Sequence, residues 1–463
     1  MPRSLASRFK TNVLPDGSLE LTSFDATDYD ASTLEIPAEI SGRPVKALGD
    51  FFSADSGKTL TSVRLPAGLE RIGDCAFADC KRLSSLVFPS SLAEVGGEAF
   101  EGCSALTQLV IPANVREIDF GAFARCAALV KIDVAPENPR FRSVDGVLFD
   151  AETKTLLAFP AGNDATVYVV PNGVERIAAK AFYGAERLVE IRLPASLRDV
   201  GVEAFGGCAS LTQIVIQEGV KRVGDRAFSD CSALSALRFP ASLKTLGDEP
   251  FVGCAALSKI DVAPENPRFR SVDGVLFDAD TKTLLAFPPG GSERCVVPNG
   301  VERIAYGAFE FSPRLAEIVL PESVRSVGAY AFYECSGLTA IRFPAALCEL
   351  GYSAFYRCEA LRQVEFAPDA NGLKTLPGKA FARCAALQNV ALPNGLETIE
   401  NLAFSGCETL REVRVPASVK SLDPSAFDGC SAALTLVVDA GSAAERFAKN
   451  AGIRFQIADE ADA

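Results

Sequence analysis

The chain has 463 residues, 48% hydrophobic and 23% charged, which is ordinary for a globular protein and excludes wholesale disorder, collagen and a coiled coil. It contains no His and no Trp, so a Ser-His-Asp triad, a Cys-His dyad and any His-based metal site are excluded. The formal net charge of −13 argues against nucleic acid as a partner, because phosphate binding needs a basic surface.

The N-terminal segment carries no recognisable targeting signal. Residues 1–10 lack the apolar stretch of a secretory signal peptide, and no run approaches the roughly 18 apolar residues of a membrane-spanning helix. If Met1 is the native start, the sequence predicts a cytoplasmic protein without membrane insertion. Strand-like patterns at 13–21 and 34–37 predict an N-terminal cap with a degenerate repeat over residues 1–59.

A repeat of 23 residues dominates the chain from Leu60 onward. Residues 60–80 show its pattern, Leu-x-x-Val-x-Leu-Pro-x-x-Leu-x-x-Ile-Gly-x-x-Ala-Phe-x-x-Cys, and about fifteen such units follow one another. Each unit contains two short extended pieces and a tight turn at Ala-Phe, too short to bury its own apolar residues. Stacked units form a continuous core, so the sequence predicts a mostly β solenoid over 60–432. The repeat Phe, such as Phe228, is expected to be wholly buried.

Two longer segments interrupt the repeat. Residues 127–160 and 255–288 differ only at Val130/Ser258 and Glu152/Asp280, so a block of coils has been duplicated. Each segment holds two apolar runs around a polar turn, which predicts a β-hairpin insertion, near 133–166 and near 261–293. After the last repeat, residues 442–450 form the best helix pattern of the chain, and residues 433–463 are expected to be a C-terminal cap with one helix.

The repeat unit, the Asp-Gly-Val-Leu-Phe insertions and the closing Ala-Gly-Ser-Ala-Ala-Glu-Arg-Phe segment resemble the BspA-like, or Treponema-type, leucine-rich repeat proteins. The resemblance spans nearly the whole chain. It implies a right-handed leucine-rich-repeat superhelix of 23-residue coils with parallel β ladders and short helical turns. It also implies a surface or secreted protein associated with adhesion, although the missing signal peptide departs from that pattern.

Cysteine is the first candidate for chemistry, since eleven of the 14 occupy one repeat position. These residues are Cys80, Cys103, Cys126, Cys208, Cys231, Cys254, Cys335, Cys358, Cys384, Cys407 and Cys430. Ala185 and Ser312 replace Cys in two units, so the position accepts small residues. Buried free thiols are the favoured interpretation, with disulfides or a metal as alternatives. No motif singles out catalytic carboxylates, a phosphate loop or a cofactor site, and we expect no catalytic, cofactor or metal-binding residues.

Two surface features remain as candidate binding sites. The outward positions of the main strands form a strand row from Arg64 to Arg414, in which Val residues lie next to Arg in neighbouring coils. Five of the eight Tyr residues fall between Tyr306 and Tyr356, and two stacked pairs are expected, Tyr306 with Tyr352 and Tyr333 with Tyr356. Tyr and Arg dominate binding interfaces, so the candidate partner-binding residues are Tyr306, Tyr333, Tyr352, Tyr356, Arg342 and Arg357. The alternative is that these rings only pack around the coil edges.

The sequence therefore favours a non-enzymatic scaffold that binds a protein partner, with a glycan as a second possibility and a monomer as the expected state. An intracellular structural or assembly scaffold is the alternative function, and an enzyme is the least favoured. Location is cytoplasmic if Met1 is native, and the cell surface or secretion is the alternative that the resemblance implies.

Overall fold

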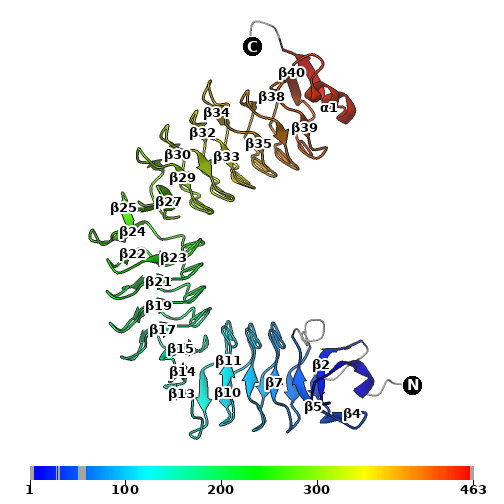
Figure 1. Ribbon diagram of the computed structural model, residues 1–463, viewed down its shortest axis with the longest axis vertical. Helices are drawn as coiled ribbons and strands as arrows, with labels where there is room; N and C mark the ends of the chain where they lie inside the picture. The colour runs from blue at the N-terminus through cyan, green and yellow to red at the C-terminus, as the bar shows by residue number, and fades with distance from the viewer. Residues whose placement is uncertain (1–4, 28, 30–31, 51–58, 459–463) are drawn as a thin grey trace. The chain divides into compact units, whose positions relative to one another are not determined.

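The computed structural model describes residues 5–27, 29, 32–50 and 59–458, so parts of both predicted caps (1–4, 28, 30–31, 51–58 and 459–463) lie outside the described residues. The chain is a β-solenoid of stacked coils (Figure 1). Its contacts divide it into two compact units. Unit 1 comprises Met1–Ser232 and Ser242–Pro250, and unit 2 comprises Ala233–Ala241 and Phe251–Ala463.

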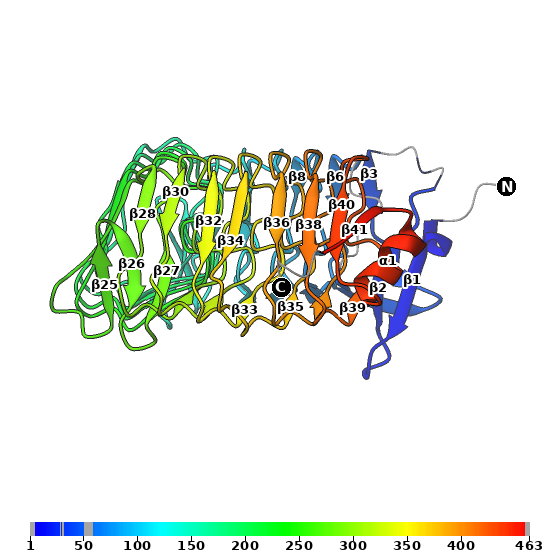
Figure 2. The ribbon, with the colours of Figure 1, turned by 90° about the horizontal axis from the view of Figure 1, so that it is seen from above.

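Each coil contributes one main strand and one short strand, and each kind stacks in parallel on its own face. In unit 2 the main strands run side by side (Figure 2). They are β28 (Arg294–Val296), β30 (Glu317–Val319), β32 (Ala340–Phe343), β34 (Gln363–Phe366), β36 (Asn389–Ala391), β38 (Glu412–Val415), β40 (Thr435–Val438) and β41 (Arg454–Ile457). The short strands there are β29 (Arg303–Ile304), β31 (Ser326–Val327), β33 (Glu349–Leu350), β35 (Thr375–Leu376), β37 (Thr398–Ile399) and β39 (Ser421–Leu422).

Unit 1 repeats the same arrangement. Its main strands include β6 (Ser62–Arg64), β8 (Ser85–Leu86), β10 (Gln108–Ile111), β12 (Lys131–Val134), β16 (Val167–Val169), β18 (Glu190–Arg192) and β20 (Gln213–Ile214). Its short strands include β7 (Arg71–Ile72), β9 (Glu94–Val95), β11 (Glu117–Ile118), β17 (Arg176–Ile177), β19 (Asp199–Val200), β21 (Arg222–Val223) and β23 (Thr245–Leu246). The predicted parallel β ladders are confirmed in both units.

The two predicted hairpin insertions are present. In unit 1, β13 (Phe141–Val144) pairs antiparallel with β14 (Val147–Asp150), and β14 with β15 (Thr155–Ala158). In unit 2, β25 (Phe269–Val272), β26 (Val275–Asp278) and β27 (Thr283–Ala286) repeat this pairing, following β22 (Ala236–Phe239) and β24 (Lys259–Val262). Within each hairpin a buried Asp accepts from an Arg, with Arg140 2.9 Å from Asp150 and Arg268 2.7 Å from Asp278.

Both ends of the solenoid carry different elements. At the N-terminal end a 3-10 turn, η1 (Leu5–Arg8), precedes β1 (Phe9–Val13), which pairs antiparallel with β2 (Leu19–Phe24). Strands β3 (Thr33–Glu35), β4 (Glu39–Ile40) and β5 (Arg43–Leu48) follow. Near the other end, α1 (Ala443–Ala451) begins after Ser442, whose side chain accepts from the Glu445 amide, and ends at Gly452 with φ 66°. The helix and its N-cap agree with the sequence pattern, and the limits of the caps as domains remain a prediction.

The repeat Phe residues form the core. Phe228 has no exposed surface, so the assignment of the inside of the coil is confirmed. The rings of successive coils stack nearly parallel, for example Phe309 on Phe332 at 4.7 Å and Phe332 on Phe355 at 4.8 Å. Each ring therefore completes the burial of its neighbours, and no coil could bury its own apolar face alone.

The turn around each repeat Phe has a fixed backbone shape. The residue two positions before Phe and the residue two positions after it have positive φ in most coils, as at Tyr330 (56°) and Glu334 (56°) around Phe332. The left-handed conformation costs a non-Gly residue about 1 kcal/mol, and the stacked coils hold it in place. Most side chains at these two positions are at least partly exposed, although Glu249 and Ser353 are buried.

Candidate functional site

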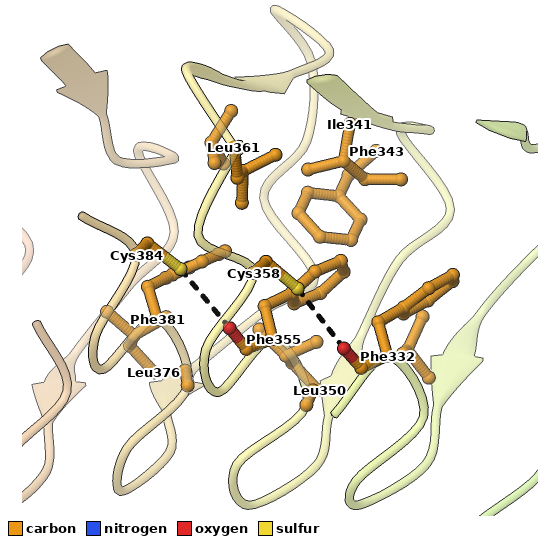
Figure 3. Close-up of a cluster of buried hydrophobic side chains, with 14 of the residues drawn as sticks. Phe332, Ile341, Phe343, Leu350, Phe355, Cys358, Leu361, Leu376, Phe381 and Cys384 are labelled. Atoms are coloured by element: carbon orange, nitrogen blue, oxygen red, sulfur yellow. Dashed lines mark hydrogen bonds between the residues drawn. The ribbon is translucent and has the colours of Figure 1, made fainter. Parts of the chain in front are cut away.

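The ladder cysteines are free thiols, as predicted, and they have a specific structural role. Cys358 Sγ donates to the carbonyl oxygen of Phe332 in the preceding coil at 3.1 Å, and Cys384 Sγ to that of Phe355 at 3.2 Å (Figure 3). The same carbonyl of Phe332 also accepts the amide of Cys335 within its own coil at 3.2 Å. The thiol thus satisfies the second lone pair of a buried carbonyl, which a purely apolar residue cannot do.

Burial also makes these thiols unreactive. It raises the pKa of Cys126 and of Cys208 to about 12, so both stay protonated at neutral pH, whereas the thiolate is the form that oxidises and binds metal. Among the residues that the structure describes, no group of three or more Cys, Asp and Glu is arranged to hold a metal ion. The ladder is therefore packing, and the candidate site has to be sought on the surface.

The five tyrosines of three successive coils form one surface cluster, which we call the Tyr cluster (Tyr306, Tyr330, Tyr333, Tyr352 and Tyr356). The predicted pair of Tyr333 and Tyr356 is present, stacked at 5.1 Å with an interplanar angle of 10°. Tyr306 is 41% exposed and Tyr352 37%. Tyr333 and Tyr356 are half-buried, and burial raises the pKa of Tyr333, so its hydroxyl stays neutral and can both donate and accept.

The predicted pair of Tyr306 and Tyr352 is wrong, because these residues lie two coils apart. Tyr330, from the coil between them, packs against Tyr306 at 5.3 Å and against Tyr352 at 5.8 Å. It also packs against Tyr333 at 5.6 Å, which joins all five rings. The sequence interpretation missed Tyr330 because it lies two positions before its repeat Phe, whereas Tyr306 and Tyr352 lie three positions before theirs. The signal that could have found it is its place two residues before Phe332.

The two candidate arginines lie in different places. Arg357 belongs to the border of the Tyr cluster, with its guanidinium 6.0 Å from the Tyr356 ring centre and its Nη1 2.9 Å from Glu334. Arg342 lies on β32, where its parallel partner is Glu365 on β34. It is part of the strand row and does not belong to the turn that carries the tyrosines.

The strand row is exposed as expected. Val87, Val215 and Val296 expose 79%, 64% and 55% of their surface. In unit 2 the row places Val296 beside Val319 and Ala391 beside Arg414. The row remains a second solvent-facing surface with apolar content, but charged residues such as Arg342 and Arg414 are interspersed among its Val residues.

No helix within the described ranges combines the length and apolarity that a membrane crossing requires.

The relatives of the chain are repeat proteins. A leucine rich cell surface protein from Faecalibacterium prausnitzii is 25% identical, with 95% of each chain covered and a TM-score of 0.47. Leucine-rich repeat proteins from Eubacterium ventriosum and Bacteroides ovatus are 18% and 21% identical. Their TM-scores are 0.44 and 0.42, and the matches cover 92% and 98% of this chain and 94% and 98% of theirs.

No curated protein matches the chain in sequence. The family model of the BspA type leucine rich repeat region matches residues 51–156, 157–272 and 302–433, which is more than half of the chain. Apart from 51–58, which lie outside the described residues, these segments contain the coils, stacked Phe rings and parallel ladders described above. The chain therefore belongs to the BspA-type leucine-rich repeat family and is a leucine-rich repeat scaffold.

Proposed function

We propose that the chain is a non-enzymatic scaffold that binds a protein partner through the Tyr cluster, in an adhesive role. The observation that carries this proposal is the joining of five tyrosine rings from three coils on one surface, two of them well exposed. Tyr combines a large apolar area with a polar tip and loses little side-chain entropy on binding. Such rings are typical binding hot spots.

The borders of the cluster suit a protein partner. Lys379 Nζ lies 5.6 Å from the centre of the Tyr352 ring, and Arg357 lies against Tyr356, so charged groups surround an aromatic centre. This is the usual arrangement of a protein interface, with an apolar core and a polar rim. An adhesive role places the chain at the cell surface, and the shielded, protonated ladder thiols are compatible with an oxidising environment because only thiolates react readily.

The test is selection of binding partners with a matched pair of variants. A displayed library of fragments from extracellular proteins is panned against the wild-type chain, and each selected fragment is then measured against Tyr306→Ser/Tyr352→Ser. We expect at least tenfold weaker binding to this double variant. Val215→Ser, which alters the exposed strand row of unit 1, should bind as the wild type does.

Equal binding by the double variant would exclude the Tyr cluster as the interface, and loss with Val215→Ser would favour the strand row instead. A glycan array run in parallel separates the two ligand classes. Binding to glycans together with an empty fragment selection would contradict the protein-binding proposal.

A further inference from the structure

Beside the Tyr cluster, unit 2 carries a groove that follows the stacking direction of the coils. One wall is formed by residues two positions after the repeat Phe, and the other by residues four positions after it. Two hollows of about 500 and 460 Å³ lie along it and share Arg357 and Glu359. We call this feature the axial groove. Its size is in the range of ligand-binding clefts.

One end of the axial groove is apolar. Its apolar lining is Gly253, Ala255, Pro289, Phe311 and Pro313, and Arg314, Glu334 and Ser336 line the same hollow. Phe311 has φ 52°, a conformation that is rare for a bulky residue and that Gly would adopt without strain. It occupies the position that is glycine in several other coils, such as Gly406. An aromatic side chain placed at the cost of backbone strain is an indication of function.

The other end is charged, with opposite signs on the two walls. Arg357 and Arg383 belong to one wall, and Glu359 and Glu408 to the other. Arg357 is paired with Glu334, whereas ion pairs of Arg383, Glu359 and Glu408 do not occur among the described residues within 4.0 Å. The groove therefore presents one uncompensated basic group, Arg383, on one side and two uncompensated acidic groups, Glu359 and Glu408, on the other, and Asp428 also lines this end.

An extended chain segment is complementary to this pattern. Its side chains alternate between two sides, with about 6.7 Å between those on one side. The coils along the groove are 5.3–5.7 Å apart at their Phe rings, so such a segment stays in register with the walls over neighbouring coils only. Acidic side chains on one side would meet the Arg wall, and basic side chains on the other side would meet the Glu wall. A proline or aromatic residue at the head of the segment would fill the apolar end against Phe311.

We propose that the axial groove binds an extended segment of the protein partner, with a proline or aromatic head in the apolar end and alternating acidic and basic residues along the charged end. This inference rests on the proposed function and adds the chemistry of the partner. Phe311 packs against Tyr333 at 5.6 Å, so the groove and the Tyr cluster form one continuous surface.

Three labelled peptides with the same Pro-Pro-Tyr head test the proposal by fluorescence anisotropy with the full chain. Their tails are alternating Glu-Lys, all Glu and all Lys. We expect the alternating tail to bind at least tenfold more tightly than either uniform tail near physiological salt. With Arg383→Glu, the arginine wall loses a basic group and gains an acidic one, while the other wall carries Ala385 at that coil, and the preference should shift toward the all-Lys tail. Absence of binding, or equal binding of all three, would overturn the inference.

Two variants test the apolar end. Phe311→Gly removes the ring, and Gly adopts the positive φ of this position without strain. Gly253→Arg fills the hollow with the residue found at the equivalent position of unit 1, Arg125. Both should weaken the alternating peptide at least tenfold with unchanged far-UV circular dichroism, and Val319→Ser, on β30 in the strand row, should leave binding unchanged. Unaltered affinity in both groove variants would overturn the assignment.

The outcomes separate this inference from the function on which it rests. If fragments selected on the wild type lose binding in the Tyr306→Ser/Tyr352→Ser variant while the groove variants have no effect, protein binding stands and the groove assignment fails. A dimer in size-exclusion chromatography that Phe311→Gly dissociates would assign the groove to a second copy of the chain and would also overturn the inference.

Discussion

The hairpin segments 127–160 and 255–288 are nearly identical in sequence, yet the coils that follow them carry different surface chemistry. In unit 1 the coil after the hairpin carries Lys180, whose Nζ donates to Glu98 and to Glu101 at 2.8 Å and lies 3.7 Å from Glu203. In unit 2 the position of Lys180 is Gly307 and that of Glu203 is Tyr330. An ion network in one copy thus corresponds to part of the Tyr cluster in the other.

The same exchange occurs at the groove positions. In unit 1 the stem of Arg125 lies against Gly184, whose added Cβ would be 3.4 Å from the Arg125 Cα and Cγ atoms. In unit 2 the equivalents are Gly253 and Phe311, so the large side chain has moved to the other coil and a hollow lies beside it. The repeat therefore fixes the core, while the turn positions around each Phe carry different side chains in the two units.

The largest expected effect is on the unfolding free energy, and it tests whether the cores of the two units are equivalent. Phe182→Ala and Phe309→Ala each remove a fully buried ring that stacks on both sides, Phe182 on Phe159 and Phe205 and Phe309 on Phe287 and Phe332. Each variant should lose about 3–5 kcal/mol of unfolding free energy, measured as a lowered midpoint in guanidinium chloride. Costs differing several-fold would mean that the cores are not equivalent.

We expect the ion network around Lys180 to contribute more to the unfolding free energy than Tyr330, the ring that stands at the position of Glu203 in unit 2. Burial alone would lower the pKa of Lys180, but the hydrogen bonds to Glu101 and Glu98 outweigh it and raise the pKa, so the ammonium stays charged at neutral pH. Lys180→Met leaves three carboxylates without this cation and should cost about 2–3 kcal/mol. Tyr330→Ser should cost about 1 kcal/mol or less, because the ring lies at the surface.

The direction of this pKa shift determines how the stabilisation by Lys180 depends on pH. Because the pKa of Lys180 is raised on folding, its contribution is fully present below the unfolded value of about 10.4 and is lost as pH rises through the folded value. The difference in stability between wild type and Lys180→Met should therefore shrink in strongly alkaline solution. A difference that stays constant there would mean that the charge of Lys180 does not stabilise the fold.

A smaller effect concerns the gap in the cysteine ladder, which falls in the coil after each hairpin, at Ala185 in unit 1 and at Ser312 in unit 2. Ser312 Oγ is fully buried and has no hydrogen-bond partner within the described residues, which costs stability. Ser312→Ala, which copies unit 1, should raise the unfolding free energy by about 1 kcal/mol. A lower unfolding free energy of Ser312→Ala would show that the hydroxyl has a partner. In the next coil, Cys335 Sγ donates to the Phe309 carbonyl oxygen at 3.0 Å. Cys335→Ser shortens this donor side chain and should therefore lower the unfolding free energy.

The period of the repeat predicted the solenoid, the buried Phe and the free ladder thiols, because each follows from residue type and spacing along one coil. The stacking of Tyr333 on Tyr356 followed in the same way, since both occupy one repeat position. Tyr330 and the axial groove were missed for a physical reason. Both depend on the left-handed residues around Phe and on contacts between different positions of neighbouring coils, as between Phe311 and Tyr333, which a repeat alignment does not display.

The smallest effect is one of accessibility, and it tests whether the ladder is equally shielded in both copies. Of the 14 thiols, Cys348 is exposed, and Cys75 and the last ladder residue, Cys430, are half-buried. Burial raises the pKa of Cys75 and of Cys430 to about 11. Native protein without reductant should therefore react quickly with a thiol reagent at Cys348 and slowly at Cys75 and Cys430. Cys126 in unit 1 and Cys384 in unit 2 should react only after denaturation, which should expose nearly all 14. Mass spectrometry of the labelled peptides reads each site, and oxidised ladder cysteines in the denatured sample would contradict the free-thiol ladder.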